Sequence, residues 1–230
     1  MNNPSDYLSI HQYRLDLVLR QIKKLNLPQN STILDLGCYP DYILQKLRRA
    51  GYKVIGICSP HEKIKDVDVY TVNLETQKLP LEKNSVDLII FTEVLEHLVN
   101  PTLVMSEIQR VLKPKARLIL TTPSAVRIQN LIKLVFHKNI TFDLETALTT
   151  SHELKNINHR HNREYTKSEL VFLVKKYNLQ IISSKCFTAY TPFRQRKTRL
   201  GKKILAWLNY FYCLFFPNRA DSIFILAQKG

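Results

Sequence analysis

Short apolar runs and stretches with helical spacing alternate along the first half of the chain. The apolar runs are typical of buried parallel strands and occupy residues 32–36, 52–57, 67–72, 85–91 and 116–121. Between and before them, apolar residues at helical spacing predict helices at about 7–25, 41–50 and 101–112. This alternation through short loops predicts an α/β fold, with a doubly wound, mostly parallel sheet and helices on both faces.

The alternation breaks in the second half of the chain. The elements expected there are a helix at 125–136, a polar histidine-rich stretch at 138–164, a helix at 166–177, and strands at 179–188 and 221–228. Thr166 and Glu169 stand at the spacing of a capping box, which fixes the start of the later helix. Counting the last two strands, the expected sheet has seven.

Length and composition favour a single domain over residues 1–230, since a chain of 230 residues with 45% hydrophobic content can bury a full core. Two stretches are longer than routine connections. We expect the first, 124–165, to be a lid or acceptor-binding insertion, and the second, 190–220, to be a basic and aromatic insertion.

The net charge of +15 is concentrated near the C-terminus. No Asp or Glu lies between Leu170 and Ala220, whereas this stretch holds ten basic residues: Lys175, Lys176, Lys185, Arg194, Arg196, Lys197, Arg199, Lys202, Lys203 and Arg219. Such a field favours an anionic partner, which is nucleic acid, an acidic membrane surface or a phosphorylated substrate. The alternative is a lysine-rich surface that only keeps the protein solvated.

The segment 204–216 is apolar and aromatic nearly all round, and basic residues precede it. It is shorter than a membrane span, so it predicts either an interfacial anchor on anionic lipid or a helix buried against the sheet or in a dimer. We recognise no secretory leader, and we expect a cytoplasmic protein that can be peripheral to the membrane. The four cysteines are far apart and form no CxxC pair, so they suggest neither a zinc site nor a disulfide framework.

Three stretches carry a family resemblance: TILDLGCYPD at 32–41, FTEVLEHLVNP at 91–101 and LTTP at 120–123. They resemble the class I S-adenosylmethionine-dependent methyltransferase superfamily, whose first motif reads L-D-[LIV]-G-C-G-x-G. Tyr39 and Asp41 stand here where the family usually has glycines. The resemblance implies a Rossmann-like seven-stranded methyltransferase sheet, with the last strand antiparallel, and S-adenosylmethionine as the cofactor.

The same resemblance implies where the cofactor binds. Residues 35–41 would hold its methionine end, with Asp41 also placed to cap the following helix. Cys58 takes the place of the acidic residue that usually binds the ribose, and Asn73 offers an acceptor for the adenine amino group, unless it is only a polar turn residue. The expected cofactor-binding residues are Asp35, Gly37, Cys38, Tyr39, Asp41, Cys58, Ser59, Asn73, Leu74 and Thr92.

Candidate catalytic residues lie at the carboxyl edge of the predicted sheet. Glu93 and His97 are four residues apart and would share one helical face, for contact with the acceptor or proton removal, or for a purely buttressing role. His161 is a further candidate for proton removal, and it belongs to a stretch similar to the R-H-x-R-E-Y-T sequence of a subgroup that modifies glycans and lipid-linked saccharides. By that resemblance, Arg163 and Tyr165 face the pocket from the lid.

His159 and His161 have the spacing of a metal-ligand pair, but no acidic or cysteine cluster accompanies them in the sequence, so we expect no metal. The chain is thus interpreted as an S-adenosylmethionine-dependent methyltransferase acting on a small-molecule, saccharide or lipid-linked acceptor. A hydroxyl acceptor needs a base and a carboxylate acceptor does not, and both stay open. The alternatives are a non-catalytic binding module of the same fold and, less favoured, an RNA-directed methyltransferase.

Overall fold

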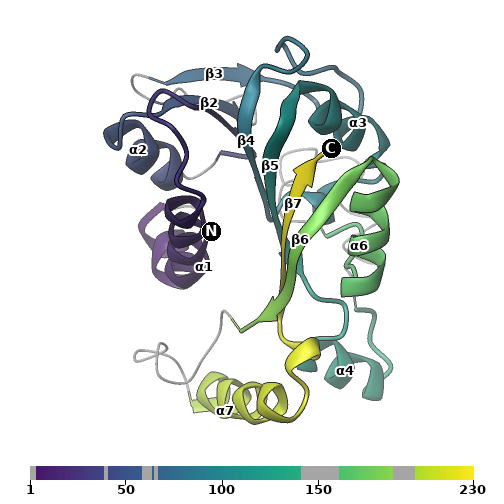
Figure 1. Cartoon of the computed structure of the whole chain (residues 1–230). Helices are drawn as coiled ribbons and strands as arrows, with labels where there is room; N and C mark the ends of the chain where they lie inside the picture. The colour runs from purple at the N-terminus through teal and green to yellow at the C-terminus, as the bar shows by residue number, and fades with distance from the viewer. Residues whose placement is uncertain (1–3, 39–40, 59–63, 65–66, 141–160, 189–199) are drawn as a thin grey trace, which may run out of the picture.

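A computed structural model describes residues 4–38, 41–58, 64, 67–140, 161–188 and 200–230. Its strands form one sheet in the order β3-β2-β1-β4-β5-β7-β6 (Figure 1). The strands are β1 Thr32–Leu36, β2 Lys53–Cys58, β3 Asp68–Thr71, β4 Val86–Thr92, β5 Leu112–Pro123, β6 Leu179–Phe187 and β7 Ser222–Lys229. Pairs among β1 to β5 are parallel, and β7 runs antiparallel to both β5 and β6. The predicted fold class is therefore confirmed.

Helices cover both faces of this sheet. They are α1 Pro4–Leu25, α2 Tyr42–Arg49, α3 Thr102–Val111, α4 Ile128–Val135, α6 Lys167–Lys176 and α7 Leu200–Phe215, with short 3-10 helices η1 Leu95–His97 and η3 Pro217–Arg219. Neighbouring residues of a strand point to opposite faces of the sheet, so each strand contributes side chains to two cores. Ile33 packs with Val18 of α1 on one face, and Leu34 packs in the other core with Met105 of α3.

Local signals fix most element ends close to their predicted positions. Thr166 and Glu169 form the expected capping box, with the Thr166 hydroxyl accepting from the Glu169 N–H and the Glu169 carboxylate accepting from the Thr166 N–H. The fifth strand is longer than predicted because it begins at Leu112 and includes Pro114. A shift in register between Val86 and Leu88 of β4 accommodates this irregular start.

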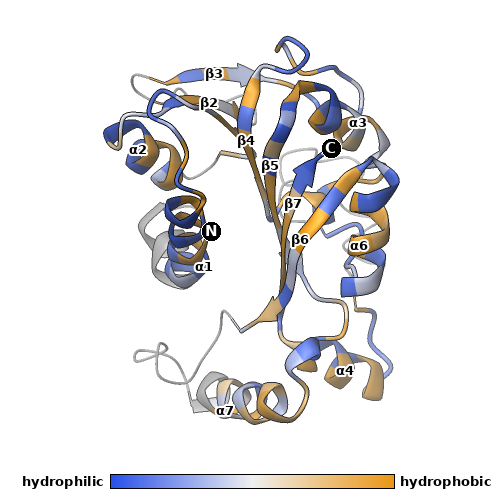
Figure 2. Ribbon diagram, in the orientation of Figure 1, coloured by the Kyte–Doolittle hydropathy of each residue, from blue (hydrophilic) through white to orange (hydrophobic). Residues whose placement is uncertain are grey.

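Two helices follow carboxyl ends of strands and so lie at that edge of the sheet. α4 comes after β5, and α7 lies between β6 and β7 in the chain; Figures 1 and 2 show both helices at one end of the molecule. The Tyr212 hydroxyl of α7 donates to the Val126 carbonyl ahead of α4. Within the described residues, no helix is long and apolar enough to cross a membrane.

Candidate active site

The end of β1 holds a buried carboxyl group, that of Asp35. Asp35 is 4% exposed, and no donor among the described residues reaches its Oδ1. Burial raises the pKa of Asp35 to about 7. Gly37 follows with φ of +86°, and a Cβ there would lie 2.2 Å from Cγ2 of Val94. This turn therefore requires glycine, and it places an unsatisfied acceptor where the sheet ends.

Cys38 and Cys58 form a disulfide, a bridge that the spacing of the cysteines did not suggest. The parallel pairing of β1 with β2 places them side by side, because the N–H groups of Gly37 and Cys38 both donate to the Ile57 carbonyl, at 2.8 and 3.2 Å. Gly56 leaves room for the bridge, since a Cβ there would lie 2.8 Å from the Cys38 sulfur. The two cysteines are far apart in the sequence, and only the register of the paired strands brings them into contact.

Other predicted cofactor residues have local partners. Asp41 occupies the N-cap position of α2 without capping it, and its carboxylate accepts from Gln45 instead, so the predicted cap is wrong. Oδ1 of Asn73 accepts from the Glu75 N–H, 2.9 Å away, which is the geometry of a polar turn residue. Leu74 packs against the core, Thr92 ends β4 half-buried, and Tyr39 and Ser59 lie outside the described residues.

The spacing predicts that Glu93 and His97 share one helical face, and this prediction is wrong. Glu93 has φ of +55° in the turn after β4, and the 3-10 helix begins only at Leu95. Arg14 of α1 forms an ion pair with Glu93 at 2.9 Å, and the Thr121 hydroxyl donates to the same carboxylate at 2.9 Å. These contacts tie the first helix to the carboxyl edge of the sheet.

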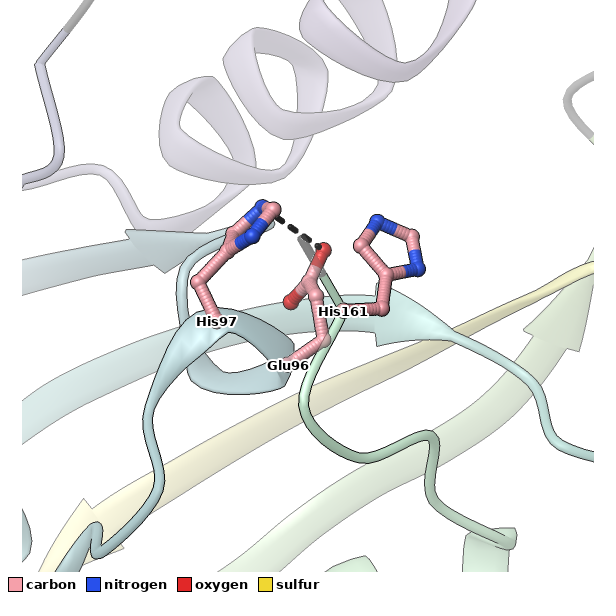
Figure 3. A group of neighbouring side chains, drawn as sticks. All are labelled: Glu96, His97 and His161. Atoms are coloured by element: carbon pink, nitrogen blue, oxygen red, sulfur yellow. Dashed lines mark ion pairs between the residues drawn. The ribbon is translucent and has the colours of Figure 1, made fainter. Parts of the chain in front are cut away.

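Glu96, His97 and His161, which we call the Glu96 cluster, converge beside this turn (Figure 3). Their candidate ligand atoms all lie within 4.8 Å of one another, and the two imidazole rings meet edge to face with centroids 5.0 Å apart. The Glu96 side chain is 1% exposed and accepts from the Thr122 hydroxyl at 3.0 Å. Burial, and then the negative charge of Glu93, raise the pKa of Glu96 well above its usual range.

Backbone contacts hold His161 against this loop although the two lie far apart in the sequence. The N–H groups of Asn162 and Arg163 donate to the Glu96 carbonyl at 2.7 and 3.2 Å. The Asn162 side-chain amide donates to the His97 carbonyl. The described end of the predicted lid therefore forms one wall of the cluster.

A buried carboxylate orients the His161 ring. Glu164 lies 3.2 Å from His161 Nδ1, pairs with Arg127 and accepts from the Asn130 amide. Burial raises the pKa of Glu164, but the hydrogen bond from His161, the Arg127 charge and the Asn130 amide outweigh it and lower that pKa overall. Because Glu164 is ionised, Nδ1 of His161 carries the hydrogen, and Nε2 is left as the basic nitrogen.

The two residues predicted to face the pocket from the lid are engaged elsewhere. Arg163 donates to Glu169 at 2.7 Å, with its guanidinium over the Tyr165 ring. Tyr165 is 5% exposed and packs in the core, and its backbone forms an isolated parallel β-bridge with Ser124. Both residues thus anchor the stretch that carries His161.

Several residues that hold the predicted site residues in place were not predicted from the sequence. These are Glu96, Glu164, Arg14, Arg127 and Asn130, which the contacts above connect. Glu96 and Glu164 stand inside the two motifs that were recognised. In both motifs the acidic residue stands within three residues of a histidine, and this is the signal that marks them.

Comparison with known proteins identifies the family. Residues 8–184 match the sequence profile of a family described as a methyltransferase domain, so the chain belongs to this family. An uncharacterized 37.1 kDa protein of a Streptomyces fradiae transposon is 36% identical over 101 residues. That match covers 39% of this chain and 29% of the other protein, so it spans less than a third of that relative.

Solved structures share the fold at low sequence identity. An S-adenosylmethionine-dependent methyltransferase of Methanosarcina mazei aligns over 90% of this chain and 96% of its own, with 20% identity and a TM-score of 0.55. Geranyl diphosphate C-methyltransferase of Streptomyces coelicolor aligns over 95% and 82%, with 15% identity and a TM-score of 0.60. These similarities support the methyltransferase fold.

Proposed function

We propose that the chain transfers a methyl group from S-adenosylmethionine to a hydroxyl group of a saccharide or lipid-linked acceptor at an anionic membrane surface. The family and fold support methyl transfer. The observation that carries the acceptor side is that an exposed aromatic face and the Glu96 cluster lie at the same edge of the sheet.

The end of β1 fits the amino-acid end of the cofactor. The unpaired Oδ1 of Asp35 needs a donor, and an ammonium group supplies one, while Gly37 lets the backbone approach closely. Cys58 does not fit the usual ribose role, because its sulfur belongs to the disulfide. Asp35 and Gly37 are therefore the residues proposed to hold the cofactor.

When bound, the cofactor supplies a methyl group already activated on a sulfonium, so the protein chiefly aligns the acceptor and excludes water. A hydroxyl acceptor must also lose its proton. The Glu96 cluster is suited to this step, since two imidazoles and a carboxylate converge at the carboxyl edge where α/β folds bind ligands. Glu93, already paired with Arg14, holds the loop in place instead.

Membrane binding is proposed from the exposed aromatic face. We define this face by the exposed residues of α4, α7 and their C-terminal ends: Leu134, Val135, Phe136, Ile204, Trp207, Leu208, Phe211, Leu214, Phe215 and Phe216. Trp207 and Phe211 stack with ring centroids 5.7 Å apart. Aromatic rings beside a strongly basic sequence are suited to the headgroup region of anionic lipid.

Vesicle flotation over a salt series tests the membrane proposal. The protein should float with phosphatidylglycerol vesicles and much less with phosphatidylcholine vesicles. Trp207→Glu with Phe211→Glu should abolish flotation, whereas Phe172→Glu, which changes an exposed phenylalanine of α6, should leave it intact. Retention on RNA with no flotation would favour the nucleic-acid alternative. Absence of cofactor binding in calorimetry would favour the non-catalytic module.

A further inference from the structure

We propose that Glu96, His97 and His161 bind a divalent transition-metal ion, such as Mn²⁺, Fe²⁺, Co²⁺ or Zn²⁺, which coordinates the hydroxyl oxygen of the acceptor. The spacing of His159 and His161 alone did not predict this set, because Glu96 and His97 stand in a distant part of the chain. Two histidines and one carboxylate form a common site for such ions, with further positions open for substrate and water.

The geometry suits a three-ligand site. Oε1 of Glu96 lies 4.0 Å from Nε2 of His97, which is beyond hydrogen-bond distance, and all three ligand atoms lie within 4.8 Å. An ion about 2.0–2.2 Å from each ligand holds its ligands about 3.0–3.5 Å apart. Binding of the ion would therefore draw the three ligand atoms together by about 1 Å.

The neighbours of the cluster provide the support that a metal site needs. Nδ1 of His161 is committed to Glu164, and Arg127 and Asn130 hold that carboxylate in turn. This arrangement orients the ring and turns Nε2 into the ligand atom, as carboxylates do for metal-binding histidines in general. Thr122 binds the other oxygen of Glu96, so Oε1 is the oxygen presented to His97.

Charge also favours a cation at this position. Glu96 is buried close to a second carboxylate, that of Glu93, and Arg14 pairs with Glu93. His97 is the described cationic partner of Glu96, at 4.0 Å, and a divalent ion bound by Glu96 and both histidines would neutralise the buried carboxylate more fully than this contact does. The His97 and His161 side chains are 24% and 30% exposed, so an acceptor can reach the open positions.

The metal ion changes how the acceptor is activated. Coordination lowers the pKa of the bound hydroxyl, whose proton then passes to solvent. The oxygen forms a bond to the methyl carbon, the carbon–sulfur bond breaks, and its electron pair stays on the sulfur. One proton is released per methyl transferred, and no histidine has to serve as a free base. This role rests on the proposed function, but binding of the metal does not.

Cobalt binding by the full chain, without a polyhistidine tag, tests the inference. One Co²⁺ per chain should bind and give the visible absorption of a nitrogen-ligated ion. His97→Asn and His161→Asn should each weaken binding by about tenfold or more. His137→Asn is the matched control, since His137 is exposed outside the cluster and has φ of +54°, a conformation that asparagine tolerates. It should bind Co²⁺ as the wild type does.

Two outcomes overturn the inference: no Co²⁺ bound by the wild type, or equal binding by the wild type and both cluster variants. Because Glu96→Gln changes a buried residue and can impair folding, the partly exposed histidines carry the test. S-adenosylhomocysteine is titrated separately. Metal binding without cofactor binding would contradict the proposed function alone, and cofactor binding without metal binding would contradict this inference alone.

Discussion

Two buried carboxyl groups at the carboxyl edge of the sheet, those of Asp35 and Glu164, differ in how far neighbouring residues bind them. At the end of β1, Asp35 is buried with one carboxyl oxygen that no described residue binds, next to the Cys38–Cys58 disulfide. In the loop that carries His161, Glu164 is equally buried but is held by an arginine, an amide and an imidazole. A buried carboxylate whose oxygens accept hydrogen bonds holds its neighbours in place. A buried carboxyl oxygen that accepts none indicates a place where a ligand binds.

The largest effect is expected when the carboxyl group of Asp35 is replaced by an amide. The pKa of this group is raised on folding, so ionising it opposes the folded state, and stability falls as pH rises from about 4 to 7. A shift of about three pKa units corresponds to roughly 4 kcal/mol. Asp35→Asn should therefore be more stable than the wild type by up to about 4 kcal/mol at pH 8, and equal to it near pH 4.

Chemical unfolding of both proteins between pH 4 and 8 measures this difference. Comparing the two curves removes the contribution of other titrating groups, such as His11, whose pKa burial and then Arg14 lower to about 4. A difference that stays constant over the whole range would show that Asp35 is ionised and satisfied in the free protein. The contrast between the two ends of the edge would then disappear.

The next effect concerns the disulfide. Cys38 and Cys58 are 20 residues apart, and a bridge closing a loop of this size stabilises by about 3 kcal/mol in the chain-entropy account. Adding a reductant should lower the free energy of unfolding by up to that amount. Cys186→Ser should respond to reductant like the wild type, because Cys186 is unbridged. A Cys38→Ser variant that loses no stability would argue against the bridge.

A smaller effect is expected at Glu164. Glu164→Gln replaces charge-assisted hydrogen bonds by neutral ones and should cost about 2 kcal/mol at pH 7. The pKa of Glu164 is lowered on folding, so this contribution is present above its unfolded pKa, near 4.5, and is lost as pH falls below that value. Thermal unfolding at pH 7 and pH 3 checks it. A loss of equal size at both pH values would contradict the ion pair with Arg127.

Sequence patterns predicted more of the fold than of the site. Apolar runs, helical spacing and the Thr166 capping box are local signals, and they gave the strands, the helices and the sheet class. The spacing of Glu93 and His97 misled because Glu93 adopts a left-handed turn that ends any continuous helix. Local periodicity cannot show such a turn.

Contacts between distant residues were beyond reach of the sequence alone. Cys38 meets Cys58 only through the register of two parallel strands. Glu96 meets His161 only through the backbone hydrogen bonds of Asn162 and Arg163. In both cases, the partners are brought together by pairing that no motif encodes.

Calorimetric titration with S-adenosylhomocysteine at pH 8 tests the central claim, that the buried carboxylate of Asp35 holds the methyl donor. The oxidised full chain should bind one equivalent in the micromolar range. Asp35→Asn should bind about tenfold more weakly or worse, the loss expected for a charge-assisted hydrogen bond, even though the variant is the more stable protein. No binding by the wild type, or unchanged binding by the variant, would contradict the claim.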